Sequence, residues 1–513
     1  MTELNHLVRL EDCADEPIRR VGHKAALLGW AQKEGLQTAG GWVLPADLFW
    51  AAMQAAKVAS QVRYLEENAL RLDPQHTRQL AGAIRGALAG DVLEEFARID
   101  AAAAHDRLDT PRLVCRSSAA MEDGRVAAFP GVFASSLDLT SPRSLAKAIV
   151  DCWRSVFSPV AIDYLLRMRA EPVDFSIAIL IQRQIAATWY GLYVSADPIT
   201  GVPLPRAELT DVAPDALVGG KSATLQARYE AGCWSGAEAA DGVDDALEIL
   251  RRWSTKLEER LHSEVDIEFA IPTQGSPLLL QCRPLTGKTP ARDLDVQRGA
   301  GQNRIFGRPC AGGNVIGFAI DGPLPTGKAR KRIAVIDRIG ADSYDLVFGY
   351  DGVIVEQDVS PLSHVAILCR EVGVPLISGI ADARALLKGR WVAVDGAGGY
   401  VEMVARPVPD ISVASLDIAV EPTLTTLELL LRVLAEARPG QDIAAERDRI
   451  ARVYSRALGG RGLHLTEAYA SDSEYDRLDR IGAELFGAEF SSQATLATWN
   501  QSISLRLAPP GNV

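Results

Sequence analysis

The sequence predicts a multidomain protein that combines α+β and α/β domains, and three observations lead to this fold class. The chain has 513 residues, which is too long for one ordinary hydrophobic core and indicates roughly three domains. Its composition, 48% hydrophobic and 23% charged residues, is typical of globular proteins. A helical N-terminal stretch is followed by short β-like runs, and then by a compact unit in which strands and helices alternate.

The first domain is expected to span 1–287. It opens with Ala- and Leu-rich stretches at helical spacing, including a helix that begins after Gly22 and ends at Gly35. From Pro111 onward, β-like runs such as DFSIAILIQRQI are separated by turns, and a helical stretch, DDALEILRRWSTKLEERLH, follows. The runs VDIEFAIP and PLLLQCRPLTG close the domain. This mixture predicts an α+β domain.

A polar, Gly-containing linker is expected over 288–304, followed by a small α/β domain over 305–405. In that domain the strand DGVIVEQD, the helix SHVAILCREV, the strand VPLISGI and the hairpin RWVAVDGAGGYVEMV succeed one another. The segment 406–513 is expected to form a short helical appendage, because its pattern is strongly helical.

Charge and composition argue against several partners. The net charge is −12, so a basic surface for nucleic acid is not expected. No stretch approaches the roughly 20 apolar residues of a membrane helix, and the N-terminus lacks the apolar run of a signal peptide. The seven cysteines are scattered without metal-ligand spacing, which indicates reduced thiols. We therefore expect a cytoplasmic protein with no nucleic-acid or membrane partner.

His364 lies at the start of a helix in the stretch Ser360 to Pro375, SPLSHVAILCREVGVP. Ser363 occupies the N-cap position, and Gly373 suits the position after the helix. Free backbone N–H groups and the helix dipole favour an anion in this first turn and disfavour a protonated ring, and a neutral imidazole is the nucleophilic form. His364 is therefore a candidate phosphoryl acceptor. The alternative is that it caps the helix or packs beside Pro361.

Two neighbouring strands near the end of the first domain offer a nucleotide site. Strand alternation puts Asp266 and Glu268 on one face of a strand, and Gln281 and Arg283 on one face of the next. Antiparallel pairing would bring these faces together and place oxygen ligands for Mg²⁺ beside a guanidinium for phosphate. The alternative is the solvated face of an ordinary hairpin.

Two further motifs could approach phosphates. In CRSSAAMEDGRVAAFPG, a short apolar run delivers Arg116 into a small-residue segment that contains Asp123 and then a Gly-containing loop. A surface turn is the alternative interpretation. Lys24 lies just inside the helix that begins after Gly22, where its ammonium could lie near an anion.

As an ordered set, these motifs resemble the phosphoenolpyruvate synthase, pyruvate phosphate dikinase and rifampin phosphotransferase family. The resemblance covers residues 15–404. SHVAILCREVGVP is similar to the family's swivelling phosphohistidine domain, which implies that fold for 305–405. VGHKAALLGW, CRSSAAMEDG and LLLQCRPLT are similar to its ATP-grasp-like nucleotide-binding domain, which implies that fold for 1–287.

The resemblance implies a role for each matching residue, with ATP and Mg²⁺ as the cofactors. His364 would carry the phosphoryl group. The residues implied to contact the nucleotide, its phosphates or the adenine pocket are Lys24, Arg116, Asp123, Gln182 and Arg283. Glu268 and Gln281 would hold the metal.

The chain also departs from the family pattern. Before the histidine, Val359, Ser360 and Leu362 replace two glycines and a threonine. This departure affects the expected acceptor more than the expected role of the histidine. His23 replaces the second glycine of the Gly-Gly-Lys opening, and Asp215 stands where the family has Glu.

The family implies an ATP-dependent dikinase-type phosphotransferase. The β-phosphoryl group would pass through His364 to a small-molecule acceptor, with AMP and phosphate released. Neither large acceptor domain of the known members fits the short linker and the segment 406–513. The acceptor, whose identity the sequence leaves open, is expected at the helical tail, at a domain interface or on another polypeptide. The tail would offer either a polar substrate surface or a homodimer interface. The alternatives are a phosphocarrier subunit and a degenerate ATP-binding regulator.

Overall fold

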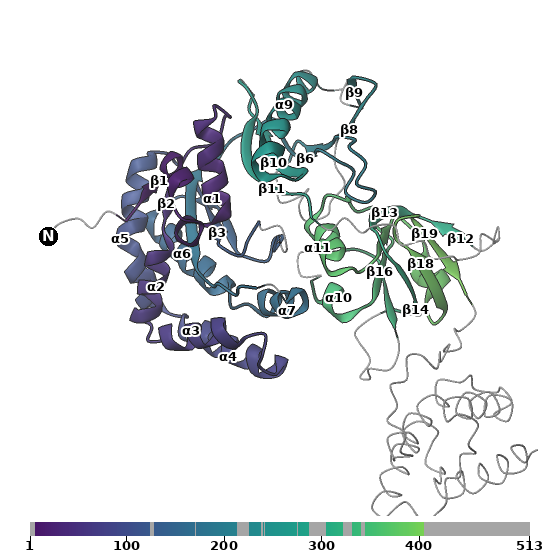
Figure 1. Ribbon diagram of the computed structural model, residues 1–513, viewed down its shortest axis with the longest axis horizontal. Coiled ribbons are helices and arrows are strands. Elements are labelled where there is room, and N and C mark those ends of the chain that lie inside the picture. Colours follow the sequence, from purple (N-terminus) through teal and green to yellow (C-terminus); the bar gives the residue numbers. More distant parts are fainter. Residues whose placement is uncertain are drawn as a thin grey trace, which may run out of the picture. The chain divides into compact units, whose positions relative to one another are not determined.

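The computed structural model describes residues 6–123, 128–169, 171–212, 225–236, 240, 242–273, 275–286, 304–321, 331–339 and 344–404 (Figure 1). All of them belong to one compact unit, 1–404. We call 6–286 the first region and 304–404 the second region. Apart from Arg304, the predicted linker lies outside the described residues, as do Asp215 and the appendage predicted over 406–513.

A five-stranded antiparallel sheet and a set of helices open the first region. The strand order is β1 (Val8–Arg9), β2 (Trp42–Leu44), β5 (Ile177–Arg183), β3 (Leu113–Ala119) and β4 (Ser135–Leu139). The helices are η1 (Leu10–Asp15), α1 (Ile18–Lys33), α2 (Ala46–Ala55), α3 (Ala59–Asn68), α4 (Pro74–Ala87), α5 (Asp91–Leu108), α6 (Pro142–Ser155) and α7 (Pro159–Met168). The predicted helix is present but begins earlier than predicted, at Ile18, and the non-helical backbone of Gly22 kinks it.

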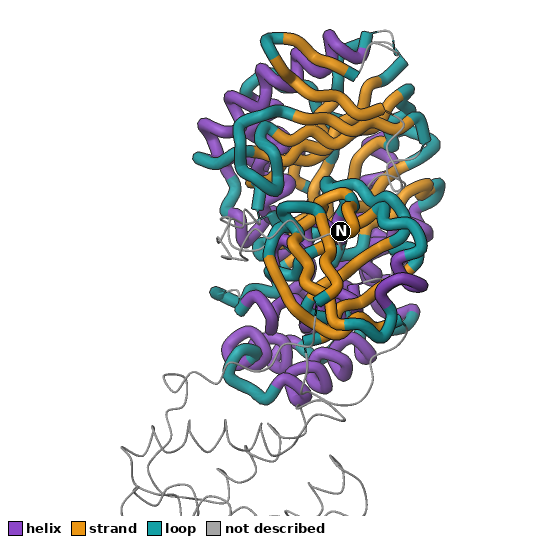
Figure 2. Tube along the Cα trace, turned by 90° about the vertical axis from the view of Figure 1, so that its right-hand side faces the viewer, coloured by secondary structure: helices purple, strands orange, loops and turns teal. Residues whose placement is uncertain are grey.

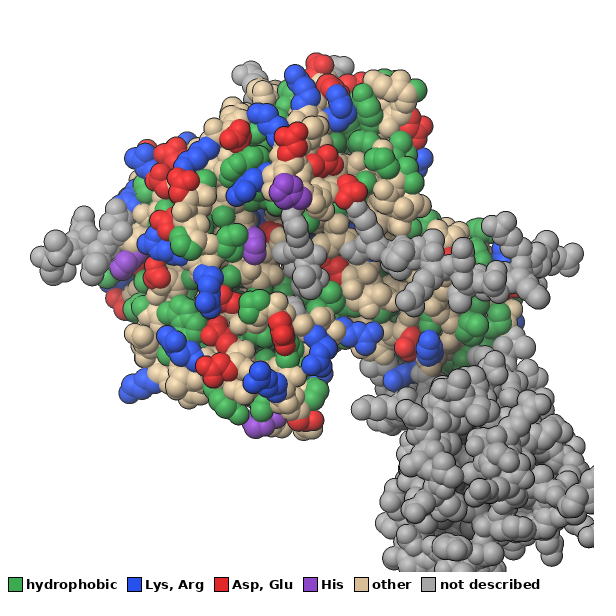
Figure 3. Space-filling model, in the orientation of Figure 1, with side chains coloured by type: hydrophobic (Ala, Val, Ile, Leu, Met, Phe, Trp, Pro, Cys, Tyr) green, Lys and Arg blue, Asp and Glu red, His purple; other side chains and the backbone are tan. Residues whose placement is uncertain are grey.

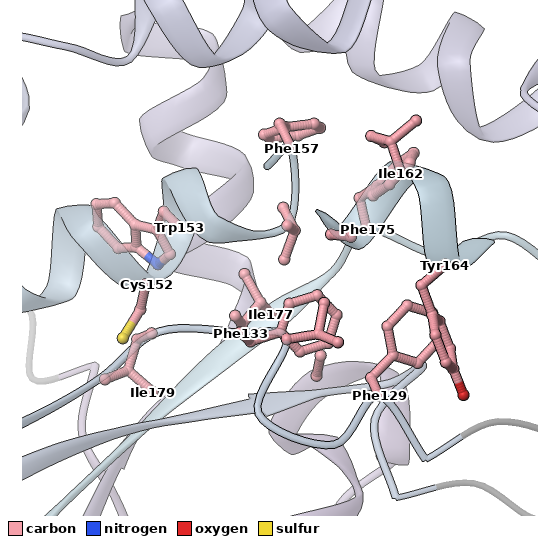
Figure 4. Packing of buried hydrophobic residues seen from close by; sticks show 14 of the residues in the cluster. Phe129, Phe133, Cys152, Trp153, Phe157, Ile162, Tyr164, Phe175, Ile177 and Ile179 are labelled. Carbon is pink, nitrogen blue, oxygen red and sulfur yellow. The ribbon is translucent and has the colours of Figure 1, made fainter. Parts of the chain in front are cut away.

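Aromatic side chains pack α6 and α7 against β5 in the core of this region (Figure 4). Trp153 lies on α6, and Tyr164 on α7 contacts Phe129 with ring centroids 4.3 Å apart. Phe129 in turn stacks on Phe133 at 5.1 Å. The loop that follows the Arg116 motif is therefore anchored on the core by its aromatic residues.

A second antiparallel sheet follows in the first region. Its strands, in spatial order, are β11 (Leu278–Pro284), β10 (Val265–Ile271), β6 (Trp189–Val194), β7 (Arg206–Thr210), β8 (Leu225–Glu230) and β9 (Cys233–Ser235). Helix α9 (Val243–Leu261) buries one apolar face in a cluster with this sheet, and α1 contributes to the same cluster. Because α1 also contacts β3 and β5, it joins the two sheets.

The second region holds an eight-stranded mixed sheet; strands are drawn in orange in Figure 2. Its order is β12 (Arg304–Phe306), β19 (Tyr400–Met403), β18 (Trp391–Asp395), β14 (Asn314–Ile320), β15 (Arg332–Ile336), β16 (Gly352–Val355), β17 (Leu376–Ser378) and β13 (Arg308–Ala311). The helices are α10 (Tyr344–Gly349), α11 (His364–Val372) and α12 (Ala383–Leu387). Strands β14, β15, β16 and β17 pair in parallel, so the predicted α/β succession is confirmed.

Within the described part of the chain, no helix combines the length and the apolar character needed to span a bilayer. On the face shown in Figure 3, acidic and basic side chains are interspersed rather than gathered by sign.

Candidate active site

A kink in α1 brings its N-terminal turn against β3. Gly22 has a φ of +75°, and a Cβ there would lie 2.0 Å from the carbonyl oxygen of Ser118. Only glycine permits both the conformation and the close approach. The Ser118 hydroxyl donates to the carbonyl of Val21 at 2.7 Å and accepts from the N–H of Ala25 at 3.0 Å. The start of the helix is thus fixed to the strand.

This arrangement buries the ammonium of Lys24, whose side chain is 3% exposed. The ammonium donates to the carbonyl of Ser117 at 2.9 Å and to the carboxylate of Glu122 at 2.8 Å. A buried charge needs such partners to offset its lost hydration. Lys24 is therefore a fixed cation beside the segment that follows β3.

Arg116 reaches from β3 to the β10–β11 hairpin of the other sheet. Its Nη1 donates to the carbonyl of Leu280 at 2.7 Å, and its Nη2 donates to Glu268 Oε2 and Gln281 Oε1, each at 2.8 Å. The predicted antiparallel pairing of the two strands is confirmed, and the structure sets its register, in which Glu268 pairs with Gln281. Two oxygens from adjacent strands therefore converge on one positively charged nitrogen.

Asp123 holds the other side of the Gln281 amide. Gln281 Nε2 donates to both carboxylate oxygens of Asp123, at 2.9 and 3.1 Å, which leaves Oε1 directed at Arg116. Burial raises the pKa of Asp123 to about 7, with Lys24 acting in the opposite direction and Glu122 adding to the rise. A nearby cation would therefore be favourable to the ionised form of Asp123.

Arg283 and Asp266 form a buried pair next to this network. They face each other across the hairpin, and Nε and Nη2 of Arg283 donate to Asp266 Oδ2 at 2.9 and 2.8 Å. Burial opposes the charge on Arg283, but Asp266, Asp123 and Glu268 outweigh it and raise the pKa of the guanidinium. Arg283 is thus a permanent, oriented positive charge.

His364 begins α11 as predicted, with Ser363 as N-cap and Gly373 in the left-handed conformation after the helix. The Ser363 hydroxyl accepts from the N–H of Ala366 at 3.4 Å. Burial, together with the positive charge of Arg283, lowers the pKa of His364 to about 3, and Glu268 opposes this shift. The half-buried imidazole is therefore neutral at physiological pH.

The structure gathers most of the predicted residues at one place. Hydrogen bonds or electrostatic interactions connect Lys24, Arg116, Asp123, Glu268, Gln281, Arg283 and His364. Gln182 stands apart from these contacts, because it lies on β5 and its amide donates to the carbonyl of Gly40 at 2.6 Å.

The loop before His364 makes contacts that the sequence patterns did not reveal. Leu362 packs in an apolar cluster with residues of the first region, among them Leu192 and Leu285. The hydroxyl of Ser360 donates to the buried carboxylate of Glu208 on β7, which also accepts from Arg308 at 2.9 Å. One feature of the sequence could have predicted these contacts. Ser360 and Leu362 are larger than the residues expected from the family pattern, or more apolar, and such side chains need partners.

Two family models match the chain. The model described as pyruvate phosphate dikinase, AMP/ATP-binding domain matches residues 18–211, and the model described as PEP-utilising enzyme, mobile domain matches residues 329–399. Together they cover just over half of the sequence, in the order that the motifs predicted. The chain belongs to this PEP-utilising family.

Relatives in the PEP-utilising family carry several names. The phosphoenolpyruvate synthase of Aeropyrum pernix is 23% identical, with 76% of this chain and 57% of that protein covered. A rifampicin phosphotransferase of a Streptomyces species is 24% identical over 57% of this chain and 37% of its own length. An uncharacterized phosphotransferase of Bacillus subtilis is 24% identical over 53% and 34%. The chain thus spans between about a third and three fifths of the length of these relatives.

The comparison with solved structures includes a match of low structural similarity. The D-alanine-D-alanine ligase from Coxiella burnetii is 11% identical over 36% of this chain and 38% of that chain, with a TM-score of 0.20, and carries no argument about the fold. The ATP-grasp-like fold of the first region and the swivelling of the second therefore stay predictions.

The family matches separate the site into two parts. Lys24, Arg116 and Asp123 lie within the AMP/ATP-binding match, and His364 lies within the mobile-domain match. The β10–β11 hairpin lies between the two matched stretches. The site is thus assembled from both matched segments of this family and from the chain that joins them.

Proposed function

We propose that this chain is an ATP-dependent dikinase-type phosphotransferase in which His364 carries a phosphoryl group from ATP to a small-molecule acceptor. One observation carries the proposal: a neutral imidazole at a helix N-terminus is held within the electrostatic influence of Lys24, Arg116 and Arg283. The match to an AMP/ATP-binding domain supports ATP as the donor. With ATP as donor, we place the reaction in the cytoplasm.

The three cations would neutralise the charge of the phosphates. Each is oriented by a carboxylate of its own: Lys24 by Glu122, Arg116 by Glu268 and Arg283 by Asp266. Groups fixed in this way need little reorganisation when charge develops on the transferring phosphoryl group. Positioning and electrostatic stabilisation would therefore supply most of the catalysis.

The residues present fit Mg²⁺. Glu268 and Gln281 offer a carboxylate and an amide oxygen, which are the hard ligands this ion prefers, and both already converge on a positive charge. Among the described residues, no group of three or more His, Cys, Asp and Glu could hold a metal by itself. The remaining ligands would be phosphate oxygens and water, as is usual for Mg²⁺. When bound, the ion would neutralise charge on the phosphates.

His364 would act as the nucleophile. Its neutral nitrogen forms a bond to the β-phosphorus while the bond to the oxygen of AMP breaks, and the free N–H groups of the first turn of α11 favour the resulting anion. Water would then take the terminal phosphoryl group, which leaves as phosphate. The alternative is transfer of this group to phosphate, which would release pyrophosphate instead. The phosphohistidine transfers its remaining group to the acceptor, so that the net products include AMP and phosphate.

Phosphopeptide mass spectrometry after incubation with Mg²⁺ and ATP tests the proposal, with nucleotide products measured in parallel. Wild type is compared with His364→Ala and with His76→Ala, a control at an exposed histidine. We expect acid-labile phosphate on His364 and AMP in wild type and in the control, and neither in His364→Ala. Labelling without turnover in small-molecule pools would indicate a phosphocarrier subunit instead. ATP bound without any label on His364 would overturn the proposal in favour of a regulator.

A further inference from the structure

Glu371 lies on α11, the helix that begins with His364. Its carboxylate accepts hydrogen bonds from residues of the first region. Its Oε1 accepts from the N–H of Ala128 at 3.1 Å and from the hydroxyl of Thr286 at 2.5 Å. Its Oε2 accepts from the hydroxyl of Tyr164 at 2.5 Å. Among the described residues, all three side-chain hydrogen bonds of Glu371 therefore go to the first region.

The position of Glu371 on the helix links these contacts to the histidine. Residues seven apart in an α-helix lie on the same face, since two turns take about 7.2 residues. His364 and Glu371 are seven apart, at opposite ends of α11. Holding the carboxylate in place therefore fixes both the rotation of the helix and the direction in which it presents His364.

The contact to Ala128 connects Glu371 to the candidate active site. Ala128 donates its N–H to Glu371, and its carbonyl accepts from the N–H of Asp123 at 3.2 Å. Asp123 in turn holds the amide of Gln281. Ala128 thus contacts both the histidine helix, through its N–H, and Asp123, the neighbour of the metal-ligand candidate Gln281, through its carbonyl.

A half-buried carboxylate without partners would be unfavourable, and burial indeed raises the pKa of Glu371. Because its partners all lie in the first region, the side chain contributes little to the folding of the second region. Its contribution is to the docking of one region on the other.

We infer that Glu371 is a positioning residue that docks the histidine helix on the first region and couples the base of the Asp123 loop to the orientation of His364. The docking follows from the contacts alone. Its effect on the rate of phosphorylation rests on the proposed function.

Histidine footprinting with diethyl pyrocarbonate measures docking without nucleotide. Modification of His364 is quantified relative to exposed His76 by peptide mass spectrometry, in wild type, Glu371→Gln and Glu402→Gln. Glu402 is a matched control, because it pairs with Arg304 at 3.2 Å inside the second region. Losing a charge-assisted hydrogen bond raises the ratio of undocked to docked molecules roughly tenfold. We expect roughly tenfold faster modification of His364 in Glu371→Gln and no change in Glu402→Gln.

A second variant, Thr286→Val, removes one donor from the opposite side and should give a smaller increase. The rate of ATP-dependent labelling of His364 is measured on the same proteins, and we expect kcat for this half-reaction to fall in Glu371→Gln, with little change in KM for ATP and no change in Glu402→Gln. Equal footprinting of His364 in wild type, Glu371→Gln and Thr286→Val would overturn the inference. Faster footprinting with no labelling in any protein would instead retain the docking role and reject the proposed function.

Discussion

Arg116 and Glu268 form an ion pair at 2.8 Å that joins the two sheets of the first region. Their side chains are 16% and 18% exposed, so water screens the pair only partly. The pair explains why Glu268 stays ionised: burial would raise its pKa, but the positive charges of Arg116, Arg283 and Lys24 lower it. An ionised Glu268 is also the form that a metal ion needs.

Glu268→Gln keeps the shape of this side chain and removes its charge. We expect Mg²⁺ to activate ATP turnover only at concentrations at least about tenfold higher, because a carboxylate ligand has been lost. We also expect a loss of about 1–3 kcal/mol in the free energy of unfolding, since Arg116 loses its partner. A Mg²⁺ titration and urea unfolding measure both. Glu248→Gln, at a half-exposed ion pair within α9, should change neither the Mg²⁺ requirement nor the stability by as much. An unchanged Mg²⁺ requirement in Glu268→Gln would exclude Glu268 as a ligand.

Lys24→Met leaves the carboxylate of Glu122 buried without its cation. Removing one partner of a buried pair costs about 3–5 kcal/mol, so we expect a large drop in the free energy of unfolding together with weaker ATP binding. The matched variant is Lys33→Met on the same helix, whose pair with Asp15 is exposed and contributes little to stability. Urea unfolding of both variants provides the test, and equal losses would show that burial of Lys24 is unimportant.

The pH dependence of the site follows from His364. The pKa of His364 is lowered to about 3 in the folded chain from an ordinary value of 6.5. As the pH falls, the folded state therefore takes up this proton only at a lower pH than the unfolded state does. The stability that the neutral His364 ring contributes is therefore fully present above pH 6.5. It is lost as the pH falls from 6.5 toward 3. We expect NMR to show a neutral His364 ring at pH 5 in the folded protein and a mostly protonated ring in urea. The stability of His364→Gln should depend less on acid pH than that of wild type. Titration of the His364 ring near pH 6.5 in the folded protein would contradict its buried position beside the cations.

Gly22→Ala tests the contact between α1 and β3. The new Cβ would collide with the Ser118 carbonyl and would sit at a positive φ, so we expect a loss of more than about 2 kcal/mol in the free energy of unfolding. Gly35→Ala is a close control, because Gly35 also has a positive φ, +81°, but no heavy atom within 4 Å of the added Cβ. The free energy of unfolding of Gly35→Ala should fall by about 1 kcal/mol. Thermal unfolding that ranks the two variants equally would show that strain, not the close approach, dominates.

Local patterns predicted much of the site. The N-cap and C-terminal glycine of α11 identified the position of His364, and strand alternation predicted that Asp266 and Glu268 share one face of a strand and Gln281 and Arg283 one face of the next. These features involve residues within a few turns or one hairpin of each other. Their geometry follows from helix and strand periods that the sequence displays directly.

The sequence by itself therefore determined the order of the elements, the family and most of the chemical groups at the site. Only the tertiary structure decided which groups meet. Arg116 contacts Glu268 across 152 residues of sequence, and Ala128 contacts Glu371 across 243. It also showed that Asp266 orients Arg283 and that Glu208 accepts from Ser360. Such contacts depend on how helices and sheets pack against one another, and no local period of the sequence records that packing.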